Sequence, residues 1–359
     1  MDKISIKAAC ELLGISRPTL NNYRKKYHLA EFRLGGMIHF SKTEIIEKII
    51  LLASVVQRDV SLTLLSDSKI RDLLPLQGVY DLRRIKGIDA YGVMALLCSI
   101  KSHLKESEAN SVSLLLDRSP FCSYLDSIGF FAEVERAHSG RISCNYSALQ
   151  KRAMTRTAII VPLHLIGYRG AEKKILDEIY DPLLKQGFSE AYCGYIGWII
   201  GELCDNAHTH SEGPCYLIIE GLESPSTATR YLSIAVGDIG IGIPDSLKKN
   251  SKYTSLRDEV LLPMAFLSEV SWMEVEPKRG KGLNDVMSIS KGNSSWLRVE
   301  SGRLGMRFDF RGGQDKIEFV DPIVQAPGTR FCLVLIDSEF KKFSRASINK
   351  IMSDFLETQ

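Results

Sequence analysis

Three side chains suited to metal and phosphate chemistry lie four residues apart in the segment 195–211. This segment has the apolar spacing of a long helix, and it contains Glu202, Asn206 and His210. Residues four apart lie on one face of a helix, so the three side chains form a polar stripe. A carboxylate and an amide on one face can order a water molecule and complete the oxygen shell of Mg²⁺ beside a phosphate group. Taken alone, the stripe is more typical of a solvated polar face.

A glycine-rich segment that suits a flat ligand follows this helix. The strand-like residues 233–236 lead into Asp238, Gly240 and Gly242. Glycines let the backbone come close to a flat ligand, and Asp238 is placed to accept a hydrogen bond from it.

A second glycine-rich segment suits phosphate. Lys281 lies between Gly280 and Gly282, and a helix-like stretch, 284–290, comes next. Backbone amides at a helix N-terminus, with cations beside them, bind phosphate well. A Pro-Gly-Thr-Arg segment, 327–330, then opens an apolar strand. The sequence has neither a P-loop nor a Gly-x-Gly-x-x-Gly motif, so the nucleotide sites that those motifs build are excluded.

In this order the four segments resemble the Bergerat-fold ATP site of the GHKL superfamily, which includes gyrase, the heat-shock chaperone, mismatch-repair ATPases and histidine kinases. The first box has the form Asn-Ala-x-x-His-Ser at 206–211, which is most similar to anti-sigma-factor kinases. The matching residues are Glu202, Asn206 and Ala207, then Asp238–Pro244, then Gly280, Gly282 and Leu283, then Gly328 and Thr329.

The resemblance implies a Bergerat α/β sandwich over residues 155–338, with ATP and Mg²⁺ as cofactors. It implies that Asn206 ligates Mg²⁺ and that Glu202 orients or deprotonates the attacking water or hydroxyl. It implies that Asp238 binds the adenine amino group, with Thr329 supporting it through water. The other implied contacts are Gly240 and Gly242 with adenine, Lys281 and the amides of Gly280 and Gly282 with phosphate, and 245–280 as a lid.

The N-terminal residues 1–52 carry the basic excess of the chain. They hold nine basic and five acidic side chains, whereas the whole chain has a net charge of +3. Apolar spacing predicts three helices, over 6–13, 17–26 and 42–52. Ser16 is a good N-cap for the second helix, and Pro18 lies in its first turn. Alternation around a Gly-Gly pair predicts a hairpin over 32–40.

This arrangement resembles the winged helix-turn-helix of the MerR and excisionase families. The second helix displays side chains suited to base edges and phosphates, so duplex DNA is the expected partner. A small helical docking domain with a basic face is the alternative. A single such module makes a small interface, which favours a homodimer. The expected DNA-binding residues are Arg17, Thr19, Asn21, Asn22, Arg24 and Lys25.

Residues 53–150 read as mixed α/β and resemble a STAS domain. Such domains place Asp-Ser-Ser-Gly at the start of a helix. Asp89 and Gly92 match this motif, but Ala90 and Tyr91 fill both serine positions. The interpretation is a STAS-like fold that serves as a protein–protein or dimerisation surface without a phosphorylation switch. An unrelated α/β spacer is the alternative.

Composition places the chain among globular proteins. Apolar residues make up 45% and charged residues 25% of 359 residues, which excludes collagen-like and disordered classes. The longest apolar stretches are far too short to span a bilayer, and the eight cysteines are scattered, so a cytoplasmic protein with reduced thiols is expected. Residues 339–359 have a helical stripe that favours packing onto a sheet.

The expected architecture is therefore an α/β multidomain protein with a winged helix-turn-helix, a STAS-like domain and an ATP-binding domain. The leading functional hypothesis is an ATP-responsive DNA-binding regulator. The alternative is a serine/threonine protein kinase of the anti-sigma-factor type that acts on a partner protein.

Overall fold

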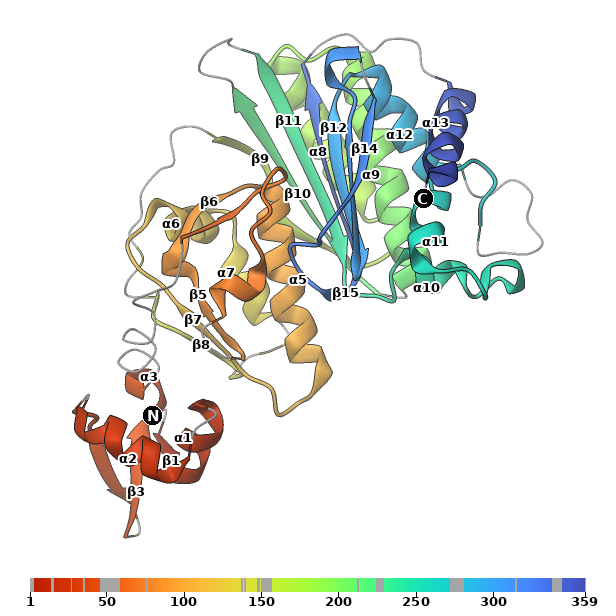
Figure 1. Ribbon diagram of the computed structural model, residues 1–359. Coiled ribbons are helices and arrows are strands. Elements are labelled where there is room, and N and C mark those ends of the chain that lie inside the picture. Colours follow the sequence, from red (N-terminus) through yellow and green to blue (C-terminus); the bar gives the residue numbers. More distant parts are fainter. Residues whose placement is uncertain are drawn as a thin grey trace.

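The computed structural model arranges the chain as an N-terminal module, a middle module and a larger C-terminal module (Figure 1). The residues that the structure describes are 3–13, 16–26, 28–34, 36–45, 59–74, 77–136, 138, 140–146, 149, 157–211, 213–223, 229–271, 281–313, 315–337 and 344–358.

The N-terminal module is built from short helices and a three-stranded antiparallel sheet. Its elements are β1 (Lys3–Ser5), α1 (Ile6–Leu13), α2 (Arg17–Lys26), β2 (Glu31–Leu34), β3 (Met37–Ser41) and α3 (Lys42–Ile45). The two predicted helices and the hairpin are confirmed. β1 joins the free edge of β3, which the sequence pattern did not predict. The predicted third helix is described as far as Ile45, and its remainder lies outside the described residues.

The middle module contains two sets of parallel strands around a long helix. Its elements are β4 (Val60–Leu62), η3 (Ile70–Leu73), β5 (Val79–Asp81), η4 (Leu82–Arg84), β6 (Ile85–Ile88), α5 (Ala90–Glu106), β7 (Val112–Leu115), α6 (Pro120–Ser127), α7 (Phe130–Glu135) and β8 (Ile142–Cys144). β4 pairs with β6, and β5, β7 and β8 form a separate three-stranded sheet.

The Asp89 and Gly92 positions have a local structural role. Asp89 caps α5, because its Oδ1 accepts a hydrogen bond from the Gly92 amide at 3.0 Å and its Oδ2 accepts one from the Leu64 amide at 2.8 Å. A Cβ on Gly92 would overlap the carbonyl oxygen of Leu62. Glycine is therefore required for α5 to approach β4 so closely.

The C-terminal module is a seven-stranded antiparallel sheet with helices α8, α9 and α12 on one face (Figure 1). The strand order is β14-β13-β12-β15-β11-β10-β9. The elements are β9 (Thr157–Ile166), α8 (Glu172–Lys185), α9 (Glu190–Ser211), β10 (Cys215–Glu223), β11 (Arg230–Asp238), α10 (Ile243–Leu247), η6 (Ser251–Tyr253), α11 (Asp258–Met264), α12 (Gly282–Gly292), β12 (Trp296–Gly302), β13 (Leu304–Asp309), η7 (Arg311–Gly313), β14 (Lys316–Val320), β15 (Ala326–Ile336) and α13 (Arg345–Glu357).

Both faces of this sheet are buried, because alternate residues of its strands belong to different cores. Leu217 and Ile219 of β10 pack with the helices α8, α9 and α12. Tyr216 and Ile218 pack instead with the middle module, whose helix α5 lies across β10, β11 and β15. The apolar helix α5 therefore finds its partner within the chain, and the middle module shares one core with the sheet.

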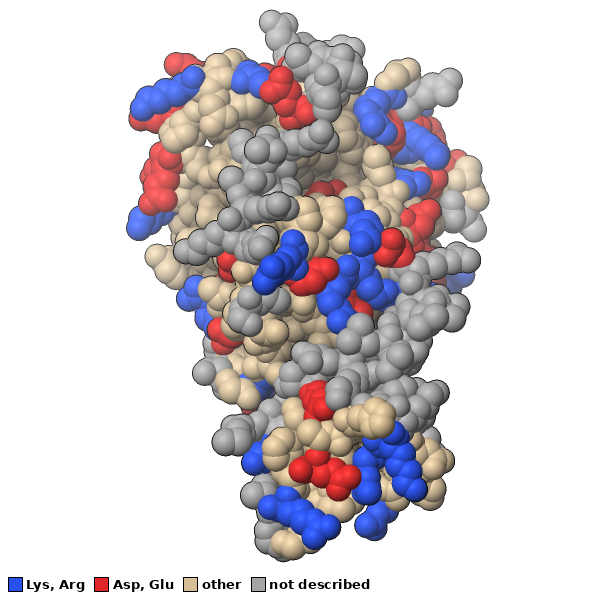
Figure 2. Space-filling view, turned by 90° about the vertical axis from the view of Figure 1, so that its left-hand side faces the viewer, with Lys and Arg blue, Asp and Glu red and all other residues tan. Residues whose placement is uncertain are grey.

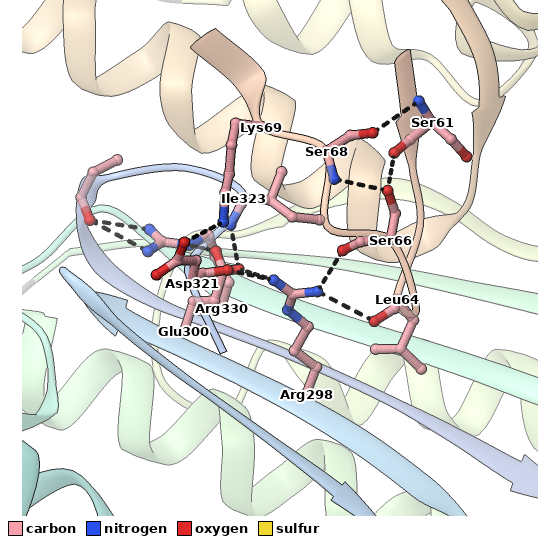
Figure 3. A network of polar contacts seen from close by, with 11 residues as sticks. Ser61, Leu64, Ser66, Ser68, Lys69, Arg298, Glu300, Asp321, Ile323 and Arg330 are labelled. Atoms are coloured by element: carbon pink, nitrogen blue, oxygen red, sulfur yellow. Dashed lines mark hydrogen bonds and ion pairs between the residues drawn. The ribbon is translucent and has the colours of Figure 1, made fainter. Parts of the chain in front are cut away.

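A buried network of charged groups also joins these two modules (Figure 3). Arg298 of β12 is fully buried, and its NH1 donates hydrogen bonds to the carbonyl oxygens of Leu64 and Ser66 in the middle module. Its NH2 donates to Glu300 Oε1 at 3.0 Å, and Arg330 of β15 lies on the other side of that carboxylate. Three fully buried charged residues thus lie at the junction between the modules.

The C-terminal helix α13 packs onto other helices. Ile348 and Met352 are buried in the core of the C-terminal module, and α13 contacts α11 and α12. The ring of Phe355 also packs against a strand, where it contacts the ring of Phe319 in β14. The apolar stripe was predicted, but its surroundings are mainly helical.

Candidate functional site

A cavity of about 270 Å³ in the C-terminal module brings the four predicted boxes together. It is bounded by α9, the end of β11, α10, the start of α12 and β15. The predicted residues that line it are Glu202, Asn206, Asp238, Gly242, Lys281, Gly282 and Thr329. Gly240 lies beside the cavity, and Gly280 lies outside the described residues. Segments more than 120 residues apart in the sequence therefore meet at one site.

Asp238 is a buried carboxylate at the end of β11, with a side chain held by the turn that follows it. Its Oδ1 accepts a hydrogen bond from the Gly240 amide at 2.8 Å. Burial raises its pKa to about 6, against the opposing effects of the Gly240 amide and the Arg330 charge. A Cβ on Gly240 would overlap Ser211, and a Cβ on Gly328 would overlap the carbonyl oxygen of Asp238. The glycines are thus needed for this close packing around the carboxylate.

Thr329 lies opposite Asp238 and belongs to a chain of hydroxyl contacts. Its Oγ1 is 3.1 Å from Ser301 Oγ, which in turn accepts a hydrogen bond from the Ile243 amide at 2.7 Å. Gly242 has a φ of 84°, in the region that favours glycine, and it precedes α10. Ser301 could not be predicted from the sequence, because an isolated serine in a strand has no distinctive pattern.

Glu202 and Asn206 face the N-terminus of α12. A Cβ on Gly282 would overlap Glu202 Oε2 and lie 3.6 Å from Asn206 Nδ2. Burial raises the pKa of Glu202 above its usual range, and the neighbouring Asp285 and Asp205 carboxylates add to this effect. Asn206 Nδ2 is buried, and it has no hydrogen-bond partner within the described part of the chain.

The two histidines of this helix have separate local partners. His210 lines the cavity, and its Nδ1 is 2.7 Å from Ser246 Oγ. His208 Nδ1 is 3.1 Å from the carbonyl oxygen of Gly213. Residues two apart on a helix point in different directions, and the two rings accordingly contact different elements.

The lid predicted over 245–280 is described in part. Residues 245–271 include the end of α10, η6 and α11, while 272–280 lie outside the described residues. Lys248 pairs with Asp258, and the side-chain Nδ2 of Asn250 donates a hydrogen bond to the carbonyl oxygen of Ser271 at 3.1 Å. These contacts lie within the segment, of which Ser246, Leu247, Ala265, Val270 and Ser271 line the cavity.

The second helix of the N-terminal module exposes most of the predicted DNA-binding side chains. Leu20 is buried in the small core of this module, which turns the polar face of α2 outward. The exposed residues are Arg17, Asn21, Asn22 and Lys25, whereas the side chain of Thr19 lies outside the described residues. The Arg24 side chain is only 29% exposed, and its Nε pairs with Glu31 Oε1 of β2 at 2.7 Å. Figure 2 shows basic side chains interspersed with a few acidic ones on one face of this module, at the bottom of the view.

The comparisons with known proteins concern this module. Residues 4–47 match the family described as a helix-turn-helix domain, so the chain carries such a domain at its N-terminus. Helix-turn-helix domains are typical of DNA-binding regulators. No curated protein matches the chain.

Two further features concern the helices and the cysteines. None of the helices in the described ranges combines the length and apolar character needed to cross a bilayer. The eight cysteines form no disulfide in this structure, and most of them are buried.

Proposed function

We propose that the protein is a DNA-binding regulator whose C-terminal module binds ATP with Mg²⁺. The observation that carries this proposal is the convergence of the four boxes on one cavity, with the buried carboxylate of Asp238 at one end and the Glu202–Asn206 stripe at the other. A buried carboxylate that is already held by one amide is suited to accept a hydrogen bond from an adenine amino group. The unpartnered Asn206 Nδ2 supports the proposal, because a buried donor without an acceptor is costly and a phosphate oxygen would accept its hydrogen bond.

The residues present fit the cofactors that the resemblance implies. Asn206 would hold Mg²⁺, which would neutralise phosphate charge when bound. The first turn of α12, with Lys281 beside it, offers backbone amides and a cation for phosphate oxygens. Burial raises the pKa of Glu202 above that of an ordinary glutamate, which makes its carboxylate a stronger base toward water or a hydroxyl group.

The middle module is in position to sense this site. Helix α5 lies directly behind Asp238: Cys98 Sγ is 3.7 Å from the Asp238 carbonyl oxygen, and Lys105 Nζ donates to the carbonyl oxygen of Ile239 at 3.3 Å. A Cβ on Gly237 would lie 2.6 Å from Met94 Cγ. Any movement of the Asp238 turn would therefore displace α5.

The same module touches the DNA-binding module. Lys42 Nζ of α3 donates a hydrogen bond to Ser111 Oγ, which precedes β7, at 3.2 Å. Coupling requires that nucleotide favour one arrangement of the modules over another, and about 1–3 kcal/mol of coupling would change DNA affinity roughly 5- to 150-fold. A gel-shift or anisotropy titration with genomic fragments, with and without ATP and Mg²⁺, tests this. A DNA affinity that does not change with nucleotide would support the DNA-binding function and contradict the coupling.

Incubation of the protein with labelled ATP separates the proposed regulator from the kinase alternative. Bound but unaltered ATP supports a nucleotide-gated switch, and released phosphate supports an ATPase cycle. Label transferred to a co-purified protein would support the anti-sigma-factor type of kinase. Absence of ATP binding in calorimetry would contradict the nucleotide part of the proposal altogether.

The ionisation of Asp238 should govern nucleotide affinity. Its raised pKa, about 6, means that lowering the pH from 7 to 5 protonates the carboxylate and replaces a charged acceptor with a weaker neutral one, so ATP affinity should fall over this range. Asp238→Asn should weaken binding at pH 7 by about 1–3 kcal/mol and abolish this pH dependence. Calorimetry across pH, with Asp354→Asn on the exposed face of α13 as the control, measures both effects. Equal affinity in the variant and the wild type would show that Asp238 does not contact the nucleotide.

DNA binding by the N-terminal module should depend steeply on salt. Phosphate contacts release counterions, with a log–log slope of about −0.9 for each phosphate neutralised. Arg17→Ala should therefore weaken binding and make the slope shallower by about one phosphate contact. Arg303→Ala, in the exposed turn between β12 and β13, removes the same charge and should leave binding unchanged. If both variants weaken binding equally, only the net charge of the protein matters and α2 is not the contact surface.

A further inference from the structure

Arg169 lies at the wall of the cavity, in the loop that joins β9 to α8. Its guanidinium group forms a two-point pair with Asp205 of α9, in which NH2 donates to Oδ2 at 3.0 Å and Nε contacts Oδ1. Both residues line the cavity. The Arg169 side chain is 60% exposed and that of Asp205 is 37% exposed, so water reaches the pair and the arginine can change partners.

The position of this pair along α9 places it far from the Asp238 end of the cavity. Ser211, the last residue of α9, abuts Gly240 and so marks the Asp238 end. Asp205 comes six residues earlier, which is about 9 Å along the helix axis. A nucleotide whose base lies against Asp238 would extend its phosphates along α9 toward this pair.

This end of the cavity holds the carboxylates of Glu202 and Asp205, and it also holds positive groups that are suited to phosphate. The N-terminus of α12 faces Glu202 and Asn206, as the close approach of Gly282 shows. Lys281 lies beside it and lines the cavity. Arg169 approaches the same space from the β9–α8 loop, so positive groups surround it from two sides. Arginine is well suited here, because its planar group binds a phosphate through two parallel hydrogen bonds, as it now binds Asp205.

We propose that Arg169 is a ligand of the terminal phosphate of ATP, and that it exchanges the Asp205 carboxylate for this phosphate when the nucleotide binds. The inference rests on the proposed function, in which the cavity binds ATP. ADP lacks the terminal phosphate, so in the ADP-bound protein Arg169 stays with Asp205. Arg169 is therefore the residue through which the site distinguishes ATP from ADP.

The test compares the affinities of the full-length protein for a non-hydrolysable ATP analogue and for ADP, each with Mg²⁺, by calorimetry. Arg169→Ala should weaken binding of the ATP analogue by about 10-fold or more, the usual effect of losing a charge-assisted contact, and change ADP binding by less than about twofold. Asp205→Asn releases Arg169 and should leave the affinity for the ATP analogue unchanged or raise it. Arg307→Ala is the matched control, because Arg307 forms a comparable partly exposed pair with Glu318 on strands remote from the cavity.

The two variants of the pair separate a phosphate ligand from a structural ion pair. If the pair only holds the loop against α9, removing either member has the same consequence. The proposal would thus be overturned if Arg169→Ala and Asp205→Asn both weaken the binding of the two nucleotides alike. It would also be overturned if Arg169→Ala leaves both affinities unchanged. A wild-type protein that binds neither nucleotide would contradict the proposed function itself. Thermal melting of each variant establishes that it is folded.

Discussion

Arg298→Met is expected to lower the free energy of unfolding by about 3–5 kcal/mol, the usual consequence of removing one member of a buried charge pair. Arg298 is fully buried between the middle module and the sheet, and its guanidinium lies 5.2 Å from the centre of the Tyr91 ring. Methionine preserves much of the volume but none of the hydrogen bonds. The carbonyl oxygens of Leu64 and Ser66 lose their donor. Glu300 loses its close charged partner and keeps the backbone amide of Ile323 and the more distant guanidinium of Arg330, at 3.7 Å.

Chemical denaturation followed by circular dichroism measures this effect. Arg307→Ala is again the control, since its partly exposed pair with Glu318 should contribute at most about 1 kcal/mol. Because the middle module and the sheet share one core, both should unfold in the same transition. A loss of less than about 1 kcal/mol in Arg298→Met would show that the network does not hold the two modules together.

The local elements of the fold could be predicted from the sequence because their signals are local. The helix over 17–26 follows from an N-capping serine, an early proline and apolar spacing, and α2 has these bounds. The hairpin formed by β2 and β3 follows from alternation on both sides of a glycine pair. Helix α9 begins five residues before the predicted start at 195, because its first turns are polar on one side and apolar on the other.

The relation between the modules could not be predicted, since it depends on contacts between distant residues. Arg298 and Leu64 are 234 residues apart, and nothing in either neighbourhood indicates the other. An arginine in a strand is normally read as solvent-exposed, whereas here it is buried against the middle module. The apolar helix α5 carried a signal for burial but not for its partner, which is the second face of the sheet.

In the candidate site, too, the residues that belong to motifs could be predicted, whereas isolated residues could not. Glu202, Asp238 and Thr329 belong to short motifs with recognisable spacing, and the cavity brings them together. Arg169 and Ser301 belong to no motif, because a loop arginine and a strand serine gain their meaning only from the fold. A raised pKa at Asp238 or Glu202 likewise depends on burial that no local pattern records.

Glu202→Ala is expected to keep ATP binding and to lower the rate of phosphate release or transfer by about 10²- to 10⁴-fold, the usual contribution of a general base. The expectation follows from the position of its carboxylate against the N-terminus of α12, one helical turn from Asn206. Alanine leaves the amides of α12 and the side chain of Asn206 in place, so affinity should change little while proton removal is lost.

The pH profile tests the same role independently. Burial and the Asp285 and Asp205 carboxylates raise the pKa of Glu202, so a falling pH protonates it earlier than an ordinary glutamate and the wild-type rate should decline accordingly. Glu178→Ala, which removes an exposed carboxylate from α8, serves as the control and should keep both the rate and the profile. Unchanged turnover in Glu202→Ala would show that another group removes the proton. A wild-type protein that binds ATP without turning it over would restrict Glu202 to a role in binding and leave the nucleotide as a switch.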